Sequence, residues 1–200
     1  MEILIVRHGE TVWNKDGKIQ GTANIQLNEH GRDLARKTGE ALKDIQIDRI
    51  YSSPLDRAYE TASLIMGDRN LEIIKDDRIR EICFGEYEGQ KIEELEKETS
   101  FTHFFKHPEL FIPGKDGETL EALCKRGADF MENEILPLNN TCKRVMIVAH
   151  GAMNKALMMY VKNQDISKFW SGGLQQNCNV IILDYKDEEF QIIDEQKIFY

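Results

Sequence analysis

The sequence has few cysteines, few prolines and no long hydrophobic run, and each shortage excludes a class of protein. Its four cysteines form no C-x-x-C pair, so a zinc knuckle has no support and reduced, mostly buried thiols are expected. The apolar run Ile3–Val6 is far too short to span a bilayer or to form the core of a signal peptide. No repeat and no Gly-, Pro- or Ser-rich linker interrupts the chain. We therefore expect a soluble, cytoplasmic protein with a single domain over residues 1–200.

The chain also lacks an excess of positive charge. Its 35 Asp and Glu residues outnumber 26 Lys and Arg residues, and the net charge is −9. This balance argues against binding to nucleic acid or to an acidic membrane surface. A small anionic ligand is still compatible with it, because a few arginines can make one pocket positive on an acidic protein.

Segments with strand-like and helix-like patterns alternate along the chain. Short apolar runs predict buried strands over four segments: Leu4–Val6, Arg49–Tyr51, Leu71–Ile74 and Arg144–His150. Capping residues and apolar residues at helical spacing predict four helices: one after Asn28, one starting near Pro54 and continuing through Ala58 and Ile65, one over Thr119–Leu136 and one over Lys155–Val161. Two further strands joined by a tight polar turn are expected in 179–196.

This alternation predicts an α/β protein, a three-layer α/β/α sandwich with a mainly parallel central sheet and one antiparallel edge strand. Residues from roughly 90 to 115 differ, because a charged helical piece at Glu93–Glu98 precedes a stretch rich in aromatics. We expect this stretch to form a small helical cap insertion. Ligands of such sheets bind beyond the carboxyl ends of the strands.

Four segments carry unusual polar residues for their positions: "RHGETVWN" (7–14), "YSSPLDRAYETA" (51–62), "REICFGEYEG" (80–89) and "VAHGAMNKAL" (148–157). In two of them His-Gly directly follows an apolar strand. We therefore expect His8 and His150 to emerge at one edge of the sheet. Each segment alone is weak evidence, since a lone histidine after a strand is most often structural.

Together and in this order, the four segments resemble the histidine phosphatase superfamily (phosphoglycerate mutase-like, branch 1), which includes cofactor-dependent phosphoglycerate mutases and many small phosphatases. The resemblance covers nearly the whole chain and implies the fold and phosphohistidine chemistry. It implies that His8 is the nucleophile and Glu81 the proton donor, and that three residues line the phosphate pocket: Arg7, Arg57 and His150. It also suggests further substrate contacts at Asn14, Gln20, Gly21 and Gly151.

Elementary chemistry supports these roles. Arginine has paired donors that suit phosphate oxygens, so Arg7 and Arg57 are natural clamps. A neutral imidazole at His8 can attack phosphorus if a backbone carbonyl holds its other nitrogen, and Gly9 would permit the close packing this needs. A charged His150 would donate a hydrogen bond to the phosphoryl oxygens.

The leaving alkoxide needs a proton, which Glu81 can supply and later recover from water. A solvated glutamate is mostly ionised at neutral pH, so the pocket or the bound phosphate must favour the protonated form. Glu10, Glu86 and Glu88 are rivals by residue type, and we interpret them as loop charges. Glu81 is preferred because "IRE" matches the L-x-E position of the family. The Gly117–Thr119 stretch resembles a helix start of the family and is interpreted as structural.

Three alternatives stay open. A phosphoglycerate mutase of the family would carry a longer basic insertion after the acidic loop, so a phosphatase acting on a small-molecule phosphomonoester is favoured. His8, His150 and Glu81 also have the residue types of a metal site, but two nearby arginines would repel the cation. A non-catalytic member would have lost residues that are all present here. We expect no cofactor and no metal, and a monomer or a homodimer.

Substrate specificity is expected to come from the cap, roughly Ile92–Pro113, and from the loop Trp13–Ile25. Four cap aromatics are available either to contact an apolar or sugar-like leaving group or to form the core of the cap: Phe101, Phe104, Phe105 and Phe111. The core interpretation is preferred. The identity of the substrate stays open among sugar phosphates, phosphoglycerates and nucleotide-derived monoesters.

Overall fold

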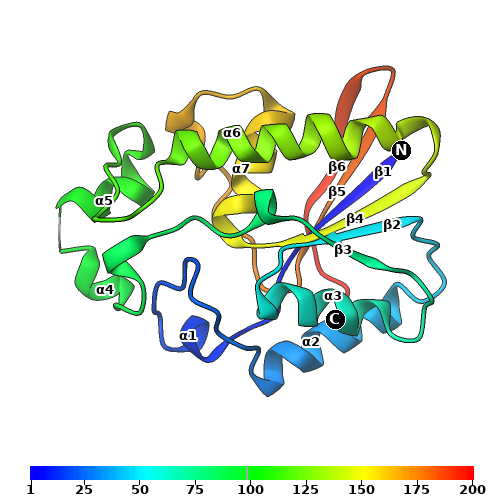
Figure 1. The fold of residues 1–200 in the computed structure, drawn as a ribbon, viewed down its shortest axis with the longest axis horizontal. Helices are drawn as coiled ribbons and strands as arrows, with labels where there is room; N and C mark the ends of the chain where they lie inside the picture. Colours follow the sequence, from blue (N-terminus) through cyan, green and yellow to red (C-terminus); the bar gives the residue numbers. More distant parts are fainter. Residues whose placement is uncertain (98) are drawn as a thin grey trace.

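The computed structural model describes residues 1–97 and 99–200, and its centre is a mixed sheet of six strands in the order β3-β2-β4-β1-β5-β6 (Figure 1). The strands are β1 (Glu2–Arg7), β2 (Arg49–Ser52), β3 (Ile73–Lys75), β4 (Arg144–Ala149), β5 (Val180–Lys186) and β6 (Glu189–Lys197). Pairings among β1, β2, β3 and β4 are parallel. β5 runs antiparallel to β1 and to the edge strand β6. The predicted mainly parallel sheet is confirmed. The one antiparallel strand, predicted at the edge, is β5, which lies inside the sheet between β1 and the edge strand β6.

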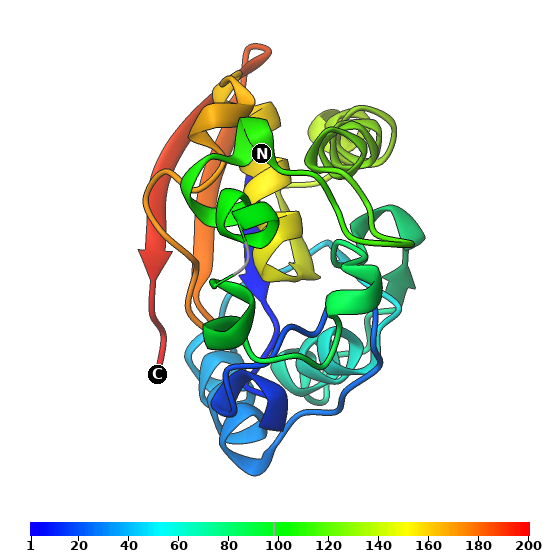
Figure 2. The same ribbon diagram turned by 90° about the vertical axis from the view of Figure 1, so that its left-hand side faces the viewer.

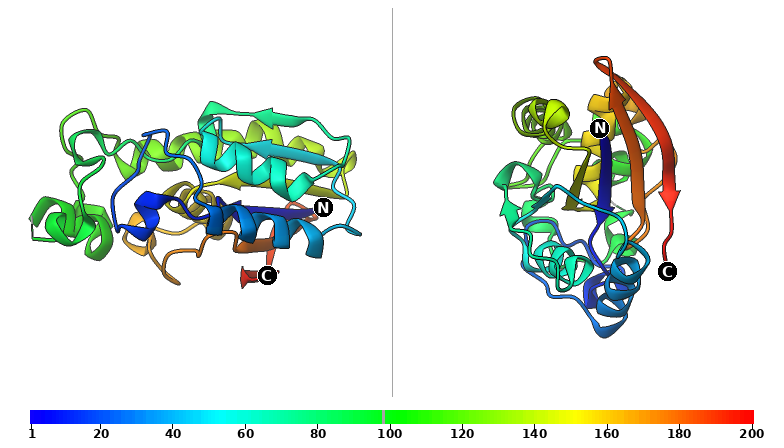
Figure 3. Two further views of the ribbon diagram at one scale, coloured as in Figure 1. Left: turned by 90° about the horizontal axis from the view of Figure 1, so that it is seen from below. Right: turned by 90° about the vertical axis from the view of Figure 1, so that its right-hand side faces the viewer.

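Helices cover both faces of the sheet. The side chains of β1 alternate between the faces, as a strand requires: Leu4 and Val6 pack with α2 (Glu29–Ala41) and α3 (Asp56–Met66), whereas Ile3 and Ile5 share a core with α6 (Leu120–Phe130) and α7 (Gly151–Lys162). Seen from below, α2 and α3 lie in front of the strands (Figure 3, left). The three-layer α/β/α arrangement is therefore confirmed.

Several helix boundaries differ from the sequence prediction. α7 starts at Gly151 rather than Lys155, because His150 is extended and forms the N-cap position. The helix predicted over Thr119–Leu136 ends as an α-helix at Phe130 and continues as a π turn and a 3₁₀ turn. Pro137, which cannot donate a helical hydrogen bond, accounts for the loosened end.

The other boundaries are closer to the prediction. Asn28 and Thr119 cap α2 and α6 through side-chain oxygens, as predicted. α3 begins at Asp56, two residues after Pro54, and β3 is shifted toward Lys75. Short 3₁₀ turns occupy Asp77–Ile79, Gly85–Tyr87, Pro108–Leu110, Leu136–Asn140 and Ile166–Lys168.

The cap contains α4 (Ile92–Leu95) and α5 (Thr99–Lys106), with α1 (Val12–Lys15) nearby. It lies beyond the carboxyl ends of the parallel strands (Figure 1) and faces the viewer in Figure 2. Of the helical piece predicted over Glu93–Glu98, residue Glu98 lies outside the described residues. Phe101, Phe104 and Phe111 are buried and Phe105 is half-buried. The aromatic rings pack on one another, so the prediction that they form a core is confirmed.

The four cysteines are free thiols. Only Cys178 is fully buried, whereas Cys83, Cys124 and Cys142 are half-buried, so the expectation of mostly buried thiols is wrong. Among the described residues, no helix combines the length and the apolar character that a membrane span needs.

Candidate active site

A pocket of about 90 Å³ is lined by residues that follow the parallel strands and by residues of the cap. Eight of the nine residues predicted for the site line this pocket: Arg7, His8, Asn14, Gln20, Gly21, Arg57, Glu81 and Gly151. The ninth, His150, is fully buried and its ring centroid lies 5.2 Å from that of His8. The fold thus brings together all nine residues, which come from six separate stretches of chain.

His8 directly follows β1, and its ring is held in one orientation. The Nδ1 atom lies 2.7 Å from the carbonyl oxygen of Gly9, which can only accept, so Nδ1 carries the proton and Nε2 has a free lone pair. The pKa of His8 lies well below its usual value, because the ring is buried and because Arg57 and Arg7 are positively charged. His8 is therefore a neutral imidazole with Nε2 available.

Gly9 makes the tight turn after His8 possible. A Cβ at Gly9 would lie 2.6 Å from the carbonyl oxygen of Gly31 in α2, a distance that side chains do not tolerate. The backbone amide of Gly9 also donates to the hydroxyl of Thr61 in α3, at 2.9 Å. The prediction that glycine permits close backbone packing beside His8 is confirmed.

Arg57 reaches from α3 and links the loop before α2 to His8. Its Nε atom donates to His8 Nε2 at 3.3 Å, and its two terminal nitrogens donate to the carbonyls of Gly21 and Ala23, each at 2.7 Å. Burial lowers its pKa to about 10, which keeps it charged at neutral pH. Gly21 has a φ of 52°, and a Cβ there would collide with Glu88. Arg57 thus presents a fixed cation beside the unprotonated nitrogen of His8.

Arg7, at the end of β1, is fixed by a residue far away in the sequence. One of its terminal nitrogens donates to the backbone carbonyl of Gln175. The side chain of Gln175 is in turn held by Asn154 of α7, at 2.7 Å, and by the carbonyls of Ile5 and Asn179. The Nε atom of Arg7 is buried and has no partner among the described residues. Burial lowers the pKa of Arg7 and the nearby Glu81 opposes this shift.

His150 is paired through one nitrogen and unpaired through the other. Its Nε2 atom lies 2.7 Å from the hydroxyl oxygen of Ser53, whereas Nδ1 is buried and finds no partner in the described part of the chain. Its pKa lies well below the usual value because of burial and of the charge on Arg57. The ring is neutral in the free pocket, so the condition that His150 be charged is not met there.

Glu81 lies against the first turn of α7. Its Oε1 atom accepts from the backbone amides of Ile82 and Met153, each at 3.0 Å, and Oε2 accepts from that of Ala152 at 3.2 Å. The amino end of a helix is partly positive and has amides without helical partners, which explains why a carboxylate settles there. Oε2 therefore accepts one hydrogen bond, whereas Oε1 accepts two.

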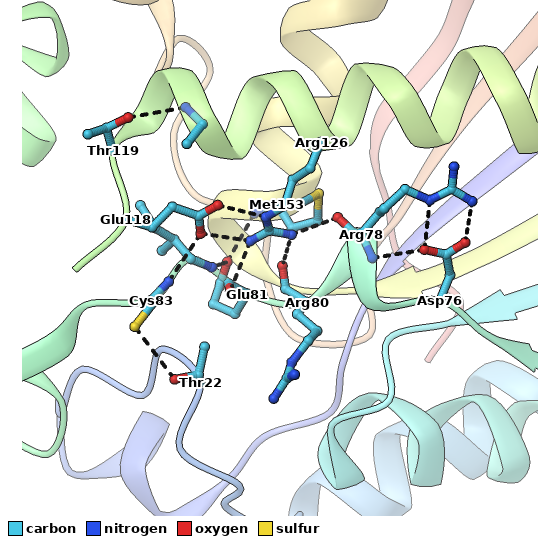
Figure 4. Close-up of polar contacts among 12 residues, drawn as sticks. Thr22, Asp76, Arg78, Arg80, Glu81, Cys83, Glu118, Thr119, Arg126 and Met153 are labelled. Carbon is cyan, nitrogen blue, oxygen red and sulfur yellow. Dashed lines mark hydrogen bonds and ion pairs between the residues drawn. The ribbon is translucent and has the colours of Figure 1, made fainter. Parts of the chain in front are cut away.

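The backbone before Glu81 is held by Arg126 of α6 (Figure 4). The guanidinium donates to the carbonyl oxygens of Arg78, Arg80 and Glu81 at 2.6, 2.6 and 3.1 Å. Both carboxylate oxygens of Glu118 accept from Arg126, and one also accepts from the amide of Cys83. Arg126 and Glu118 therefore fix the segment that carries Glu81, although neither lines the pocket.

The three rival glutamates serve the loops, as interpreted from the sequence. Glu10 accepts from the side chain of Asn28, and Glu86 from the amide of Lys115, each at 2.7 Å. Glu88 accepts four hydrogen bonds from Thr22, Ala23 and Phe84. None of the three lines the pocket.

Hydrogen bonds from Thr11 fix the orientation of the side-chain amides of Asn14 and Gln20. The side-chain oxygen of Asn14 accepts from the amide of Thr11, and that of Gln20 accepts from the Thr11 hydroxyl, at 3.1 and 3.0 Å. Their NH₂ groups make no hydrogen bond within the described residues. Both side chains therefore offer N–H donors to an anion in the pocket.

The pocket has two ends of different chemistry. The charged end consists of Arg7, His8, Arg57 and Glu81. The apolar end has six side chains: Phe84, Ile92, Phe104, Phe105, Trp170 and Leu174. Three of them, Ile92, Phe104 and Phe105, belong to the cap that the sequence predicted to set specificity, whereas Phe84, Trp170 and Leu174 were not predicted there. Lys18 also lines the pocket. Trp170 and Leu174 belong to the connection between α7 and β5, for which no local pattern signals contact with the cap.

Further partners of the site residues were also missed. The contacts of Ser53 with His150 and of Gln175 with Arg7 and Asn154 join residues far apart in the sequence. Arg126 has no sequence feature that distinguishes it from other partly exposed helix arginines. Among the described residues, no group of three or more His, Cys, Asp or Glu side chains is arranged to hold a metal ion.

Comparison with known proteins points to one family. The family model described as histidine phosphatase superfamily (branch 1) matches residues 3–196. The uncharacterized phosphatase PhoE of Bacillus subtilis (strain 168) is 36% identical over 194 residues, covering 96% of this chain and 92% of that protein. Phosphoserine phosphatase 1 of Hydrogenobacter thermophilus is 34% identical over 175 residues, covering 86% and 82%.

Solved structures agree. Bacillus stearothermophilus YhfR is similar to this chain with a TM-score of 0.88 and 30% identity, covering 97% of this chain and 96% of that one. These matches confirm the resemblance carried by the four motifs.

Proposed function

Because the chain belongs to the histidine phosphatase superfamily (branch 1), we propose that it is a phosphatase that hydrolyses a small-molecule phosphate monoester through phosphohistidine on His8. One observation carries the proposal: the unprotonated Nε2 of the neutral His8 lies inside the pocket and accepts a long hydrogen bond of 3.3 Å from the guanidinium Nε of Arg57. A nucleophile beside a fixed cation is what attack on an anionic phosphoryl group requires.

In the first step, Nε2 of His8 attacks phosphorus, an N–P bond forms and the bond to the leaving alcohol breaks. Arg7 and Arg57 neutralise the equatorial oxygens, and the amide donors of Asn14 and Gln20 add hydrogen bonds. Gly151 has no side chain, so the substrate can approach the backbone at the start of α7. The buried Nε of Arg7, which has no partner among the described residues, supports its role as a clamp.

His150 contributes to this step without being charged. The Ser53 hydroxyl already accepts from the amide of Leu55 at 3.3 Å and is free to donate its proton to Nε2 of His150. The neutral ring then carries its own proton on Nδ1, the nitrogen without a described partner. This N–H would donate to a phosphoryl oxygen of the bound substrate.

Glu81 handles the proton. Glu81 enters the first step in its protonated form, with the proton on Oε2, which accepts only one long hydrogen bond. This proton passes to the oxygen of the leaving alcohol and leaves Glu81 as a carboxylate. In the second step the same oxygen takes a proton from water as the water attacks phosphorus and the N–P bond breaks. Inorganic phosphate leaves and His8 returns to its starting state.

The proposal is tested by trapping phosphate on His8. During turnover of p-nitrophenyl phosphate, acid-quenched protein should carry acid-labile phosphate, and His8→Ala should lose both this phosphate and turnover. His30→Ala is the matched control, because His30 is exposed and does not line the pocket. A His8→Ala protein with normal turnover would overturn the proposal.

The same purified protein separates a phosphatase from a phosphoglycerate mutase. A phosphatase releases inorganic phosphate from p-nitrophenyl phosphate and from other monoesters. Interconversion of phosphoglycerates without phosphate release would favour the mutase instead. The lining of the pocket supports a phosphatase. A mutase must hold a phosphorylated acid in two orientations, and outside the charged end the lining residues include one basic side chain, Lys18, and mostly apolar ones.

A further inference from the structure

The side chains at the apolar end of the pocket are held in place by contacts with one another and with the backbone. Phe105 contacts Phe104 and Trp170, with ring centroids 4.9 and 5.3 Å apart. The indole N–H of Trp170 donates to the backbone carbonyl of Phe104 at 2.5 Å, so the ring turns only apolar surface to its other neighbours. Phe104 is 2% exposed and is therefore fixed by the core of the cap. This wall needs no rearrangement to receive an apolar group.

Leu174 joins the apolar end to the charged end. Its side chain is 50% exposed, although it is large and apolar. It lies against the start of α7, since a Cβ on Gly151 would be 2.8 Å from Leu174 Cδ1 and 3.7 Å from Arg7 Nε. An apolar group attached to a phosphate bound by Arg7 would therefore meet Leu174 directly.

The pocket offers little to a positively charged leaving group. Glu81 is its acidic side chain, and both carboxylate oxygens accept from backbone amides at the charged end. Lys18 is positive, makes no ion pair within the described residues and lies 5.8 Å from the ring of Trp13. A substrate ammonium would find a lysine and aromatic walls, with no carboxylate to pair with it.

We propose that the leaving alcohol of the substrate carries an apolar group, preferably an aromatic one, which binds between Leu174, Phe105 and Trp170. This inference rests on the proposed phosphatase function and names its substrate class. It separates this protein from phosphoserine phosphatases, whose name states a small zwitterionic substrate. Burial of the apolar group removes hydrocarbon surface from water and holds the phosphate in line with His8.

The test compares three alkyl phosphates: 3-phenylpropyl phosphate, ethyl phosphate and O-phosphoserine. The first two have primary alcohols as leaving groups, so the chemical step is similar and their ratio of kcat/KM reports binding of the phenyl group. We expect 3-phenylpropyl phosphate to exceed ethyl phosphate by about tenfold or more, with phosphoserine no better than ethyl phosphate. A smaller ratio, or phosphoserine as the best substrate, overturns the inference. No phosphate release from these or from p-nitrophenyl phosphate overturns the proposed function instead.

A matched pair of variants assigns the effect to this wall. Leu174→Asn should lower the ratio of 3-phenylpropyl to ethyl phosphate by about threefold or more, since an amide replaces apolar surface. Leu110→Asn is the control, because Leu110 is 54% exposed in the cap and does not line the pocket. It should leave the ratio unchanged. Thermal melting verifies that both variants fold, and an unchanged ratio in Leu174→Asn overturns the assignment.

Discussion

At the charged end of the pocket each side chain is tied to backbone groups, whereas at the apolar end the side chains are held mainly by one another. His8 and Glu81 are oriented by hydrogen bonds of 2.7–3.2 Å. Phe105 and Trp170 are oriented by ring packing. Hydrogen bonds fix direction, which phosphoryl transfer needs, and packing fixes shape, which selection of a leaving group needs. We therefore expect changes at the charged end to slow all substrates alike and changes at the apolar end to alter preference.

The largest effect should follow Arg57→Lys. Lysine keeps the charge and loses the planar fork that holds Gly21 and Ala23 and faces His8. We expect kcat/KM to fall by about 10²–10³-fold, by the same factor for 3-phenylpropyl and ethyl phosphate. Steady-state kinetics on both substrates checks this, with Arg32→Lys, in a surface ion pair, as the control. A changed ratio between the substrates would break the distinction between the two ends.

His150→Ala should lower kcat on the order of 10²-fold, because a hydrogen-bond donor to the transferring phosphoryl group is lost. Ser53→Ala should cost less, about tenfold, since the ring stays but its tautomer is no longer fixed by the 2.7 Å contact. Single-turnover rates of the two variants measure the difference. Equal losses, or no loss in Ser53→Ala, would contradict the proposed neutral tautomer.

Arg126→Lys tests whether Glu81 must be held in place to protonate the leaving alcohol. The segment carrying Glu81 would lose several of its anchors, so we expect turnover of ethyl phosphate to fall by about tenfold. Turnover of p-nitrophenyl phosphate should change much less, because nitrophenolate leaves without a proton. A merely structural role would slow both substrates equally, and such a result would remove Arg126 from the positioning of Glu81.

The smallest effect should be on stability in acid. Burial lowers the pKa of His8 and of His150 in the folded protein relative to about 6.5 in an unfolded chain. Below that pH the unfolded state binds more protons, so the free energy of unfolding decreases as the pH falls. Thermal melting between pH 7 and pH 5 should show this loss, and His150→Asn should weaken the pH dependence. A melting temperature that rises toward pH 5 would contradict it.

Much of the charged end was predictable because its signals are local. An apolar strand followed by Arg7-His8-Gly9, and another followed by His150-Gly151, place both histidines at one sheet edge, since parallel strands end on the same side. The early start of α7 was missed because Gly151 is a poor helix former in isolation. In the structure the extended His150 begins that helix and the amides of its first turn receive Glu81.

The apolar end was only partly predictable. The cap and its aromatic core followed from composition, and Phe101 is buried as expected. Trp170 and Leu174 carry no signal of their place, because a lone apolar residue in a loop is compatible with many surroundings. The contact from Arg7 to Gln175 spans 168 positions of the sequence, and such pairings depend on how whole layers pack.

The sequence by itself therefore determined the layered α/β architecture, the edge of the sheet where the site lies and the residue types that meet there. These follow from periodicity, capping and strand ends, which act within a few residues. Only the tertiary structure decided which nitrogen of each histidine is unprotonated or unpaired, what holds Arg7 and Glu81, and that an apolar wall lies beside the charged end. Those features depend on distances between segments far apart in the chain, and burial and hydrogen-bond direction are set only when these segments pack together.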